Sequence, residues 1–323
     1  MSNEPTMPED DIMRALEARL GRLHARQRLG IERDHEAQVF GQGLNFFHPE
    51  NLAASPLLIR AALVAVGLYR RGLANAEKVS LRENRIVSAK LPRAFDGFAI
   101  LHLSDLHVDM CPQAMARVRA LVADLSYDLC VLTGDYRGAT HGPHDAALAG
   151  MAELRDALRS PILAVLGNHD TILMTPRLEQ MGMRVLLNEC ETIVRDGARI
   201  HVAGIDDAHY FRVDNIAKAG EGIPHDEFSI LLSHTPEIFR QAAHADFDAL
   251  FAGHTHGGQI CLPGGVALTL DSTLPRAFGA GPWRYHEMQG YTSVGAGSSV
   301  LPVRFNCPPE ITLHQLQAAG DEK

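Results

Sequence analysis

Residues 98–107 read FAILHLSDLH, residues 129–135 read LCVLTGD, and residues 162–170 read ILAVLGNHD. Each stretch begins with a run of aliphatic residues and ends in a cluster of polar residues that contains Asp, Asn or His. Amphipathic helical patterns at 113–125 and 144–158 separate the three runs. Strands that alternate with helices at this pitch predict βαβ units and a largely parallel sheet.

The strand pattern continues through the rest of the chain. Further strands are expected at 184–187, 192–194, 199–205, 228–232 and 249–252, and a part without helices follows at 259–262, 265–270, 291–295 and 310–316. This order predicts an α/β fold with two sheets packed together and helices outside them.

Polar side chains follow the strands at regular intervals. Asp105 and Asp135 are 30 positions apart, and Asp135 and Asn168 are 33 apart, about the length of one βαβ unit. Two later strands lead into His234 and into the sequence GHTH at 253–256. Open α/β sheets bind ligands just beyond the carboxyl ends of their strands. We therefore expect all of these side chains to face one crevice.

The types of side chain in this crevice indicate metal ions. Carboxylate, carboxamide and imidazole groups without a thiolate suit divalent Mn, Fe or Zn. The pairs Asp105–His107 and His254–His256 are two residues apart, so each pair lies on one side of an extended chain. The number of ligands indicates two ions, which a central carboxylate can bridge, and such sites catalyse phosphoryl displacement. The sequence therefore predicts hydrolysis of a phosphate ester.

The ordered motifs resemble the signature of the calcineurin-like metallophosphoesterases. They are DLH at 105–107, GD at 134–135, GNH at 167–169, His234 and GHTH at 253–256. The resemblance covers about residues 91–316 and implies a four-layer αββα sandwich of two packed mixed sheets. It also implies one ion held by Asp105, His107 and His256, a second held by Asn168, His234 and His254, and Asp135 bridging both.

The resemblance further implies roles in catalysis and substrate binding. His169 would contact the phosphoryl oxygens or protonate the leaving oxygen, oriented by Asp170, and a water or hydroxide shared by the two ions would attack phosphorus. We expect Mn as the metal, with Fe and Zn as alternatives. Candidate contacts to the substrate phosphate are Arg137, His141 and Arg304, and each of the three could instead have a purely structural role. Asp206 and Asp207 follow another strand end, so they are further candidates for groups that support the metal ligands from behind.

Two further stretches narrow the substrate class. GHTHGGQICLP at 253–263 and LPVRFNCPPE at 301–310 resemble a bacterial subgroup of membrane-associated phosphohydrolases. That subgroup includes enzymes similar to the UDP-2,3-diacylglucosamine pyrophosphatases of lipid A biosynthesis. A phosphodiesterase or pyrophosphatase that acts on a lipid-linked or nucleotide-linked small molecule is therefore expected. The alternatives are a nuclease of the same superfamily and a non-catalytic metal-binding scaffold.

Composition argues against the nuclease, and the complete set of metal ligands argues against the scaffold. The chain has 323 residues, 46% hydrophobic and 21% charged, as in ordinary globular proteins. Its net charge of −9 and its aromatic content of 6% disfavour nucleic acid as a partner, because nucleic-acid binding needs clustered basic and stacking side chains. A scaffold would be expected to lack some of the metal ligands, and none is missing.

The N-terminal part differs in character from the rest. We expect a helical, locally basic extension at 1–90, the metallophosphoesterase domain at 91–318 and a short tail at 319–323. A helix predicted at 12–29 carries an apolar stripe beside a basic stripe of Arg19, Arg22 and Arg26. It would either lie on an anionic membrane or pack on the main domain.

The apolar segment 57–69 is too short to span a bilayer. Residues 57–95 hold eight basic and two acidic residues, so the segment could either lie on anionic lipid or pack its apolar residues in the core. No secretory signal is read at the N-terminus. A cytoplasmic protein is therefore expected, with peripheral contact at the inner face of the membrane as an option.

Overall fold

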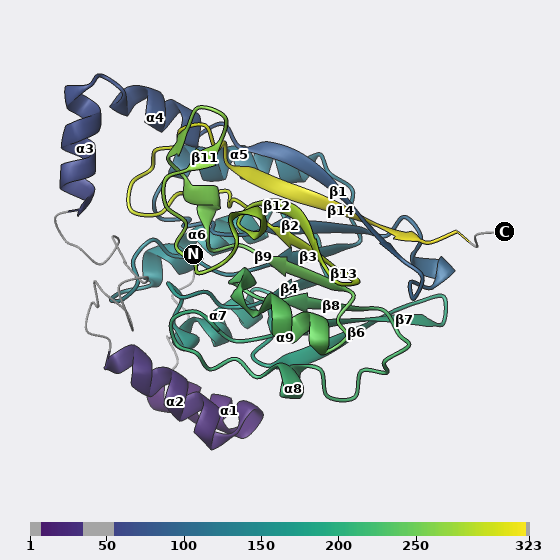
Figure 1. Ribbon diagram of the computed structural model, residues 1–323. Helices are drawn as coiled ribbons and strands as arrows, with labels where there is room; N and C mark the ends of the chain where they lie inside the picture. The colour runs from purple at the N-terminus through teal and green to yellow at the C-terminus, as the bar shows by residue number, and fades with distance from the viewer. Residues whose placement is uncertain (1–7, 35–54, 321–323) are drawn as a thin grey trace.

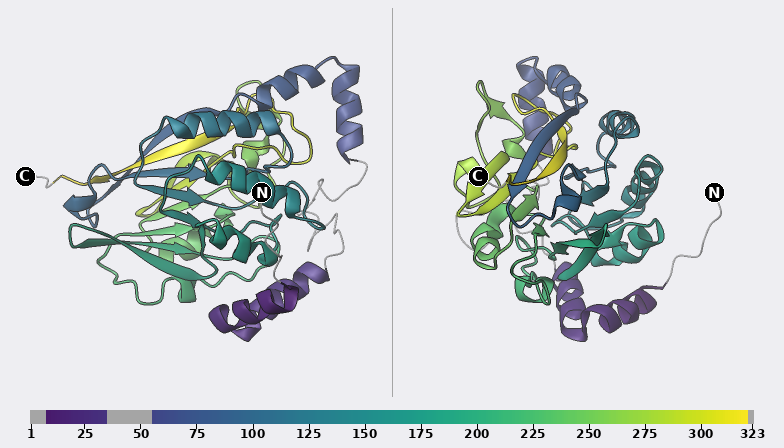
Figure 2. Two further views of the ribbon diagram at one scale, coloured as in Figure 1. Left: turned by 180° about the vertical axis from the view of Figure 1, so that it is seen from behind. Right: turned by 90° about the vertical axis from the view of Figure 1, so that its right-hand side faces the viewer.

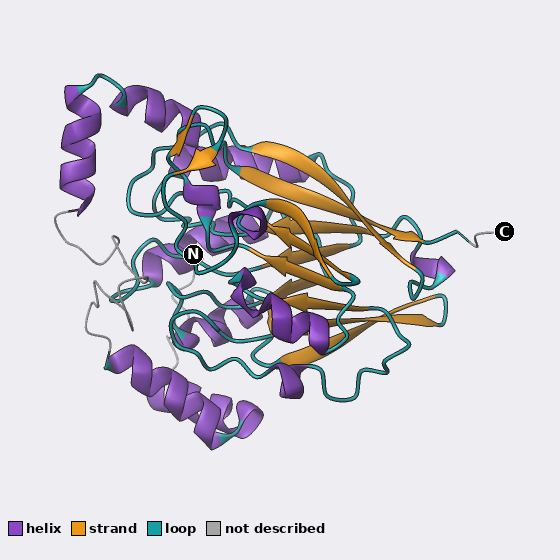
Figure 3. Cartoon of the chain, in the orientation of Figure 1, coloured by secondary structure: helices purple, strands orange, loops and turns teal. Residues whose placement is uncertain are grey.

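Two six-stranded mixed sheets form the centre of the computed structural model, which describes residues 8–34 and 55–320 (Figures 1 and 3). The first sheet has the order β1-β14-β2-β3-β4-β5. Its strands are Ser80–Ser88 (β1), Glu310–Ala318 (β14), Ala99–Leu103 (β2), Leu129–Leu132 (β3), Ile162–Ala164 (β4) and Arg184–Val185 (β5). Strands β2 to β5 are parallel, and β14 runs antiparallel to β2.

The second sheet has the order β12-β13-β9-β8-β7-β6. Its strands are Gly281–Tyr285 (β12), Met288–Thr292 (β13), Ala249–Ala252 (β9), Ser229–Leu232 (β8), Ala198–Gly204 (β7) and Glu189–Arg195 (β6). The four inner strands are parallel, and the two edge strands are antiparallel to their neighbours. A small antiparallel hairpin, Cys261–Leu262 (β10) and Val266–Ala267 (β11), lies outside both sheets.

Side-chain alternation along the strands produces the layers. Ile100 and Leu129 belong to a core shared by the two sheets, whereas the adjacent Leu101 and Cys130 pack under helices. Successive residues of a strand point to opposite faces, so each central strand is buried on both sides. The helices over the first sheet are α5 (Pro112–Ala123), α6 (Asp145–Arg155) and α7 (Thr175–Gln180), and those over the second are α8 (Ile216–Ala219) and α9 (Phe239–His244). The four-layer αββα architecture is therefore confirmed.

Two strands were not expected from the sequence. β1 pairs in parallel with β14 along nine residues, from Ser80 with Glu310 to Ser88 with Ala318. β12 forms the edge of the second sheet through a hairpin with β13. The first sheet therefore includes residues before 91, within the segment assigned to the extension.

The helical pattern at 12–29 forms two helices rather than one. α1 (Glu9–Leu20) and α2 (Arg22–Arg33) are separated at Gly21, whose φ is 92°. A positive φ such as that of Gly21 is readily available to glycine. Ile12, Leu16 and Leu20 of α1 are buried in the core of the first sheet, so the apolar stripe packs on the main domain.

The basic stripe on these helices is largely engaged in ion pairs. Arg19 contacts Glu179 at 2.8 Å and Glu189 at 2.5 Å, and Arg26 contacts Glu17. Deeper in the interface, Arg28 is fully buried and its Nε lies 3.2 Å from the Asp206 carboxylate.

Helices α3 (Ser55–Ala65) and α4 (Tyr69–Ala76) lie at the end of the molecule opposite the C-terminus, and α3 stands off the body (Figures 1 and 2). α4 packs on the segment before β14, where the Arg304 backbone N–H donates to the Gly72 carbonyl at 3.0 Å. Over residues 8–34 and 55–320, no helix has both the length and the apolarity needed to cross a bilayer.

Candidate metal centre

The predicted ligands converge where the central strands of both sheets end. Asp105, Asp135 and Asn168 follow β2, β3 and β4, and His234 and the 253–256 segment follow β8 and β9. All of these side chains are at most 7% exposed. The seven predicted ligands therefore line one buried crevice, as the topology of parallel strands requires.

The backbone at this crevice is tightly turned. Five of the predicted ligands have positive φ angles, which are uncommon for residues other than glycine. They are Asp105 (49°), His107 (38°), Asp135 (58°), His254 (72°) and His256 (50°). Strained residues of this kind cluster at functional sites because the surrounding structure holds them in place.

Adjacent glycines permit the close approach of the loops. A Cβ atom at Gly253 would lie 1.8 Å from the Ser104 Oγ, and one at Gly167 would lie 2.1 Å from the Asp135 Oδ1. No side chain fits in either position. The glycines of the GHTH and GNH motifs therefore have a steric function beside the ligands.

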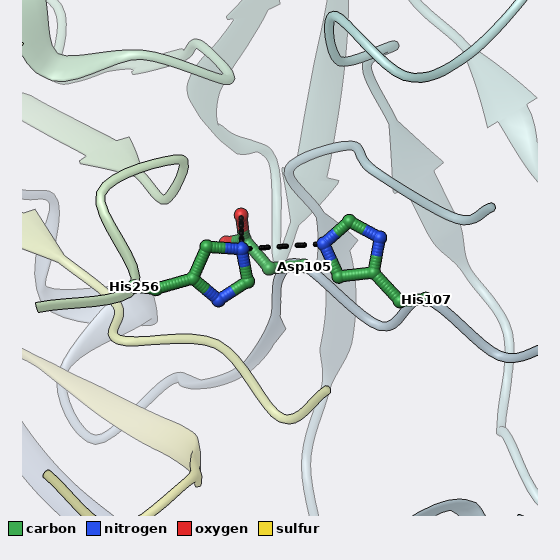
Figure 4. Close-up of side chains that lie close together, drawn as sticks. All are labelled: Asp105, His107 and His256. Carbon is green, nitrogen blue, oxygen red and sulfur yellow. Dashed lines mark hydrogen bonds and ion pairs between the residues drawn. The ribbon is translucent and has the colours of Figure 1, made fainter. Parts of the chain in front are cut away.

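The first group of ligands consists of Asp105, His107 and His256 (Figure 4). The His256 Nε2 lies 3.5 Å from the Asp105 Oδ1 and 3.2 Å from the His107 Nε2. The His107 Nδ1 donates to the Arg137 carbonyl at 2.7 Å, since a carbonyl can only accept. This fixes the tautomer and turns the Nε2 lone pair of His107 toward the ligand cluster.

The second group is centred on Asn168, whose Oδ1 lies 2.9 Å from the His234 Nε2 and 3.1 Å from the His254 Nδ1. The His234 Nδ1 donates to the Thr133 carbonyl at 2.8 Å. The His234 Nε2, like that of His107, is therefore directed into the crevice. Orientation of a histidine by a backbone carbonyl is typical of metal ligands.

Asp135 lies between the two groups. Its Oδ2 is 3.3 Å from the His234 Nε2 and 4.0 Å from the His107 Nε2. Burial by itself lowers the pKa of His234, but the Asp135 carboxylate raises it to about 10. Burial lowers the pKa of His107 to about 4, so that ring is neutral. Buried carboxylates need a compensating cation, and these donors suit divalent ions.

His169 lies beside the ligands, as expected from the sequence. Its Nδ1 donates to the Gly138 carbonyl at 2.9 Å, and its Nε2 lies 3.8 Å from the Asp135 Oδ2. The ring is held in a fixed orientation at the wall of the pocket that also contains Asp135 and Asn168.

Asp170 does not orient His169, contrary to the sequence-based expectation. Its carboxylate accepts backbone N–H groups from Asp135 at 2.8 Å, Tyr136 at 2.9 Å and Gly167 at 2.9 Å. A carboxylate satisfied by three backbone donors holds the loops together and has no free oxygen directed at the histidine ring. Asp170 therefore clamps two ligand-bearing loops.

Arg137 and His141 also lie elsewhere than expected. The guanidinium of Arg137 donates to the carbonyls of His169, Gly142 and Thr140. Both residues line a separate pocket beside α2 and are not among the residues that line the metal crevice. The two side chains follow β3 in sequence, but the chain turns them away from the crevice.

Arg304 is fully buried and is a structural arginine. Its Nη2 donates to the carbonyls of Val294 at 2.7 Å and Gly297 at 2.6 Å, and lies 3.2 Å from the His256 Nδ1. It holds the His256 ring from behind and is not exposed to a substrate.

The two acidic residues after β7, Asp206 and Asp207, are buried. Asp206 pairs with Arg28 and with His24. Asp207 accepts backbone N–H groups of Tyr210 at 2.7 Å and Phe211 at 2.6 Å. Asp207 thus shapes the loop after β7.

Sequence reasoning missed a second set of groups behind His254. The His209 ring lies against the His254 ring, with the two centroids 4.1 Å apart and the planes tilted by 48°, and the His209 Nδ1 lies 2.8 Å from the Glu237 carboxylate. Polar atoms of His209, His254 and Asp271 come within 4.8 Å of one another. His209 follows β7 at the same edge of the sheet as the ligands, which was the signal available in the sequence.

A pocket of roughly 340 Å³ opens over the ligands. Its wall includes Asp135, Asn168, His169 and His254, together with the aliphatic side chains of Ile59, Ile260, Leu268 and Val300. Polar groups are added by Gln259, Thr269, Asp271 and Ser299. No Lys, Arg, Phe, Tyr or Trp lines it within the part of the chain that the structure describes.

Comparison with known proteins agrees with this geometry. The family model described as calcineurin-like phosphoesterase matches residues 98–258. The chain is 29% identical over 270 residues to the uncharacterized metallophosphoesterase YkoQ of Bacillus subtilis, covering 80% of this chain and 98% of YkoQ. It is 28% identical over 256 residues to YkuE of the same organism, covering 75% and 87% of the two chains.

A third relative has a named activity. The phosphodiesterase YaeI of Escherichia coli is 27% identical over 232 residues, covering 68% of this chain and 82% of YaeI. The segment that the family model matches, residues 98–258, contains Asp105, Asp135, Asn168, His234 and the GHTH motif of the crevice. The chain therefore belongs to the calcineurin-like metallophosphoesterase superfamily and is a phosphoester hydrolase.

Proposed function

We propose that this enzyme hydrolyses a phosphodiester or diphosphate bond of a lipid-linked substrate with the help of two divalent metal ions, of which Mn is preferred. The observation that carries the proposal is the pocket itself, in which the ligand cluster adjoins the aliphatic side chains of Ile59, Ile260, Leu268 and Val300. A substrate that places a phosphate on the ligands would place its neighbouring group on this apolar wall. An acyl or alkyl chain fits such a wall.

The lining of the pocket favours lipid over nucleotide. A nucleotide or nucleic acid would be recognised by basic side chains on its phosphates and by aromatic rings on its bases. Among residues 8–34 and 55–320, neither kind of side chain lines this pocket apart from the histidines. A lipid-linked substrate resides in a membrane, so the proposal includes peripheral contact with a bilayer.

In the proposed mechanism, Asp105, His107 and His256 would hold one ion, Asn168, His234 and His254 would hold the other, and Asp135 would be shared between them. When bound, the ions would activate a water molecule and neutralise charge on the phosphoryl oxygens.

The remaining residues act on the substrate and on the ligands. His169, fixed by the Gly138 carbonyl, holds a proton at Nε2 for the leaving oxygen. The aliphatic wall binds the chain of the substrate and excludes water from the reacting phosphate. The Asp170 carboxylate accepts three backbone N–H groups and thereby holds the loops of Asp135 and Gly167 together.

The proposal is tested with three chromogenic diesters, namely the p-nitrophenyl esters of methyl phosphate, octyl phosphate and thymidine 5′-phosphate. Metal-stripped protein is assayed with Mn added back, beside Asp135→Asn. We expect Mn-dependent cleavage that the substitution abolishes, with kcat/KM about tenfold or more higher for the octyl ester than for the methyl ester, because burying a methylene group contributes roughly 0.8 kcal/mol.

Two controls separate the parts of this test. Leu268→Gln should remove the preference for the octyl ester, whereas Leu23→Gln, at a position 80% exposed on α2, should keep it. A preference for the thymidine ester would support the nucleotide alternative and contradict the lipid-linked one. Absence of Mn-dependent cleavage of all three esters would refute the proposed diester hydrolysis.

A further inference from the structure

Helix α3 exposes several large apolar side chains. Leu57 is 67% exposed, Leu58 68% and Val64 56%, and Val66 just after the helix is 65% exposed. Residues 56–65 read PLLIRAALVA, in which Arg60 is the one charged or polar residue. A helix on a protein surface normally turns a polar face to water. The composition of α3 is therefore typical of a segment that another apolar medium covers.

The β10–β11 hairpin adds a second exposed apolar segment. Leu262 is 49% exposed, Val266 53% and Leu268 55%. Residues 261–268 read CLPGGVAL and contain no charged residue. We use the term apolar rim for the exposed side chains of both segments, which are Leu57, Leu58, Val64, Val66, Leu262, Val266 and Leu268.

The two parts of the apolar rim meet at the mouth of the metal pocket. Ile59 of α3 and Leu268 beside β11 both line that pocket, together with the metal ligands. Figures 1 and 2 show α3 and the hairpin at the same end of the molecule. An apolar medium that covers the rim would therefore lie directly at the entrance to the site.

The charge of residues 55–76 indicates which apolar medium covers the rim. Residues 55–76 contain three arginines, Arg60, Arg70 and Arg71, and no acidic residue, although the whole chain has a net charge of −9. All three arginines are exposed. Exposed apolar side chains flanked by arginine are complementary to a bilayer with anionic headgroups. A second copy of this chain is a poorer match, because it would bring two sets of arginines together.

We propose that α3 and the β10–β11 hairpin dock on the surface of an anionic lipid bilayer, so that the metal pocket opens at the membrane and takes its substrate from it. The inference rests on the proposed function for the identity of the substrate, and on the apolar rim for the docking itself. It assigns membrane contact to α3 rather than to the stripe on α1 and α2, where Arg19 is paired with Glu179 and Glu189.

Vesicle flotation tests the docking. The full chain is mixed with vesicles of phosphatidylcholine alone or of phosphatidylcholine with phosphatidylglycerol. We expect binding to the anionic vesicles only, weakened by added salt. The double variant Leu57→Gln/Leu58→Gln should bind about tenfold or more weakly, because two leucine side chains no longer enter the bilayer. Arg70→Gln/Arg71→Gln should also bind more weakly and lose much of the salt dependence.

Matched variants on α2 provide the controls. Leu23→Gln and Arg22→Gln change exposed residues of the same types and should bind like the wild type. All of these positions are exposed and outside the metal pocket, so hydrolysis of the soluble methyl ester should be unchanged in every variant. That rate also shows that each variant is folded.

Several outcomes would overturn the docking proposal. These are failure of the wild type to float with anionic vesicles, equal binding by the Leu57→Gln/Leu58→Gln variant, or loss of binding in the α2 variants. A dimer in solution that the same leucine substitutions dissociate would show that a second copy covers the rim. Vesicle binding without any ester hydrolysis would refute the proposed function and leave the docking intact. Ester hydrolysis without vesicle binding would refute the docking and the proposed bilayer contact, and would leave the proposed hydrolysis intact.

Discussion

The substitution Asp170→Asn tests whether Asp170 holds the ligand loops together or takes part in catalysis. The Asp170 carboxylate is fully buried and accepts three backbone N–H groups, from Asp135, Tyr136 and Gly167. Burial and the charge of Asp135 raise the pKa of Asp170 to about 6. The stabilities of the wild type and of Asp170→Asn should therefore be compared at about pH 8, where the carboxylate is ionised.

The cost of the substitution follows from these contacts. The amide oxygen of Asn can replace the Oδ2 that accepts from Asp135 and Gly167, but its NH₂ group then faces the N–H of Tyr136. Leaving that buried donor unsatisfied costs about 1–3 kcal/mol. The two remaining bonds lose the charge of their acceptor, at about 1 kcal/mol each. Removing a buried charge offsets part of this, so we expect a loss of about 3 kcal/mol in the free energy of unfolding.

The assay is urea unfolding of the metal-free protein, followed by the fluorescence of Trp283, the single tryptophan, which is buried. Asp124→Asn at the exposed end of α5 is the control and should unfold like the wild type. The Mn affinity of Asp170→Asn should also fall, because the loops that carry the ligands loosen. A shift below about 1 kcal/mol with unchanged Mn affinity but lost turnover would refute the clamp and restore a role for Asp170 in the chemistry.

Three further predictions concern other buried groups. Arg28→Met should destabilise the protein by about 3–5 kcal/mol, since it leaves the buried Asp206 without its guanidinium partner; an unfolding midpoint like that of the wild type would show that α2 contributes little to the fold. Arg304→Gln should weaken Mn binding about tenfold or more, measured by calorimetry, because Arg304 holds the His256 ring. The inhibition constant of inorganic phosphate at saturating Mn should stay the same. Weaker inhibition by phosphate would instead indicate that Arg304 contacts the substrate directly. Burial by itself raises the pKa of Glu237, but its hydrogen bond to His209 and the charge of that ring lower it from 4.5 to about 2. The stability that this pair contributes is therefore present above about pH 4.5 and lost as the pH falls toward 2. Glu237→Gln should flatten that part of the stability curve, and identical curves for the two proteins would contradict the assignment.

The strand-end motifs predicted the ligand cluster because the relevant geometry is local. Asp105, Asp135 and Asn168 each follow a parallel strand, and parallel strands joined by helices must end at the same edge of a sheet. Glycines precede Asp135, Asn168 and His254 in the sequence, and Gly167 and Gly253 leave no room for a side chain beside the neighbouring loop. Sequence spacing was therefore sufficient to place these residues in one crevice.

Long-range packing decided what the sequence could not. β1 pairs with β14, more than 200 residues away, and nothing in either segment specifies that partner. Arg137 follows a strand-end motif and Arg304 lies in the distal 301–310 segment, and both were candidate phosphate contacts. Backbone carbonyls nevertheless surround both guanidinium groups. The number of carbonyls within reach of a side chain depends on how distant loops pack, so it cannot be read from neighbouring residues.

The sequence by itself determined the fold class and the ligand set, because strand periodicity and the residues at strand ends fix both. Only the tertiary structure decided which polar residues face the substrate and which hold the loops. It also brought α3 and the β10–β11 hairpin, about 200 residues apart, to the mouth of one pocket. The apolar character of α3 is visible in the sequence, but its exposure beside the metal ligands follows from the folding of the whole chain around them.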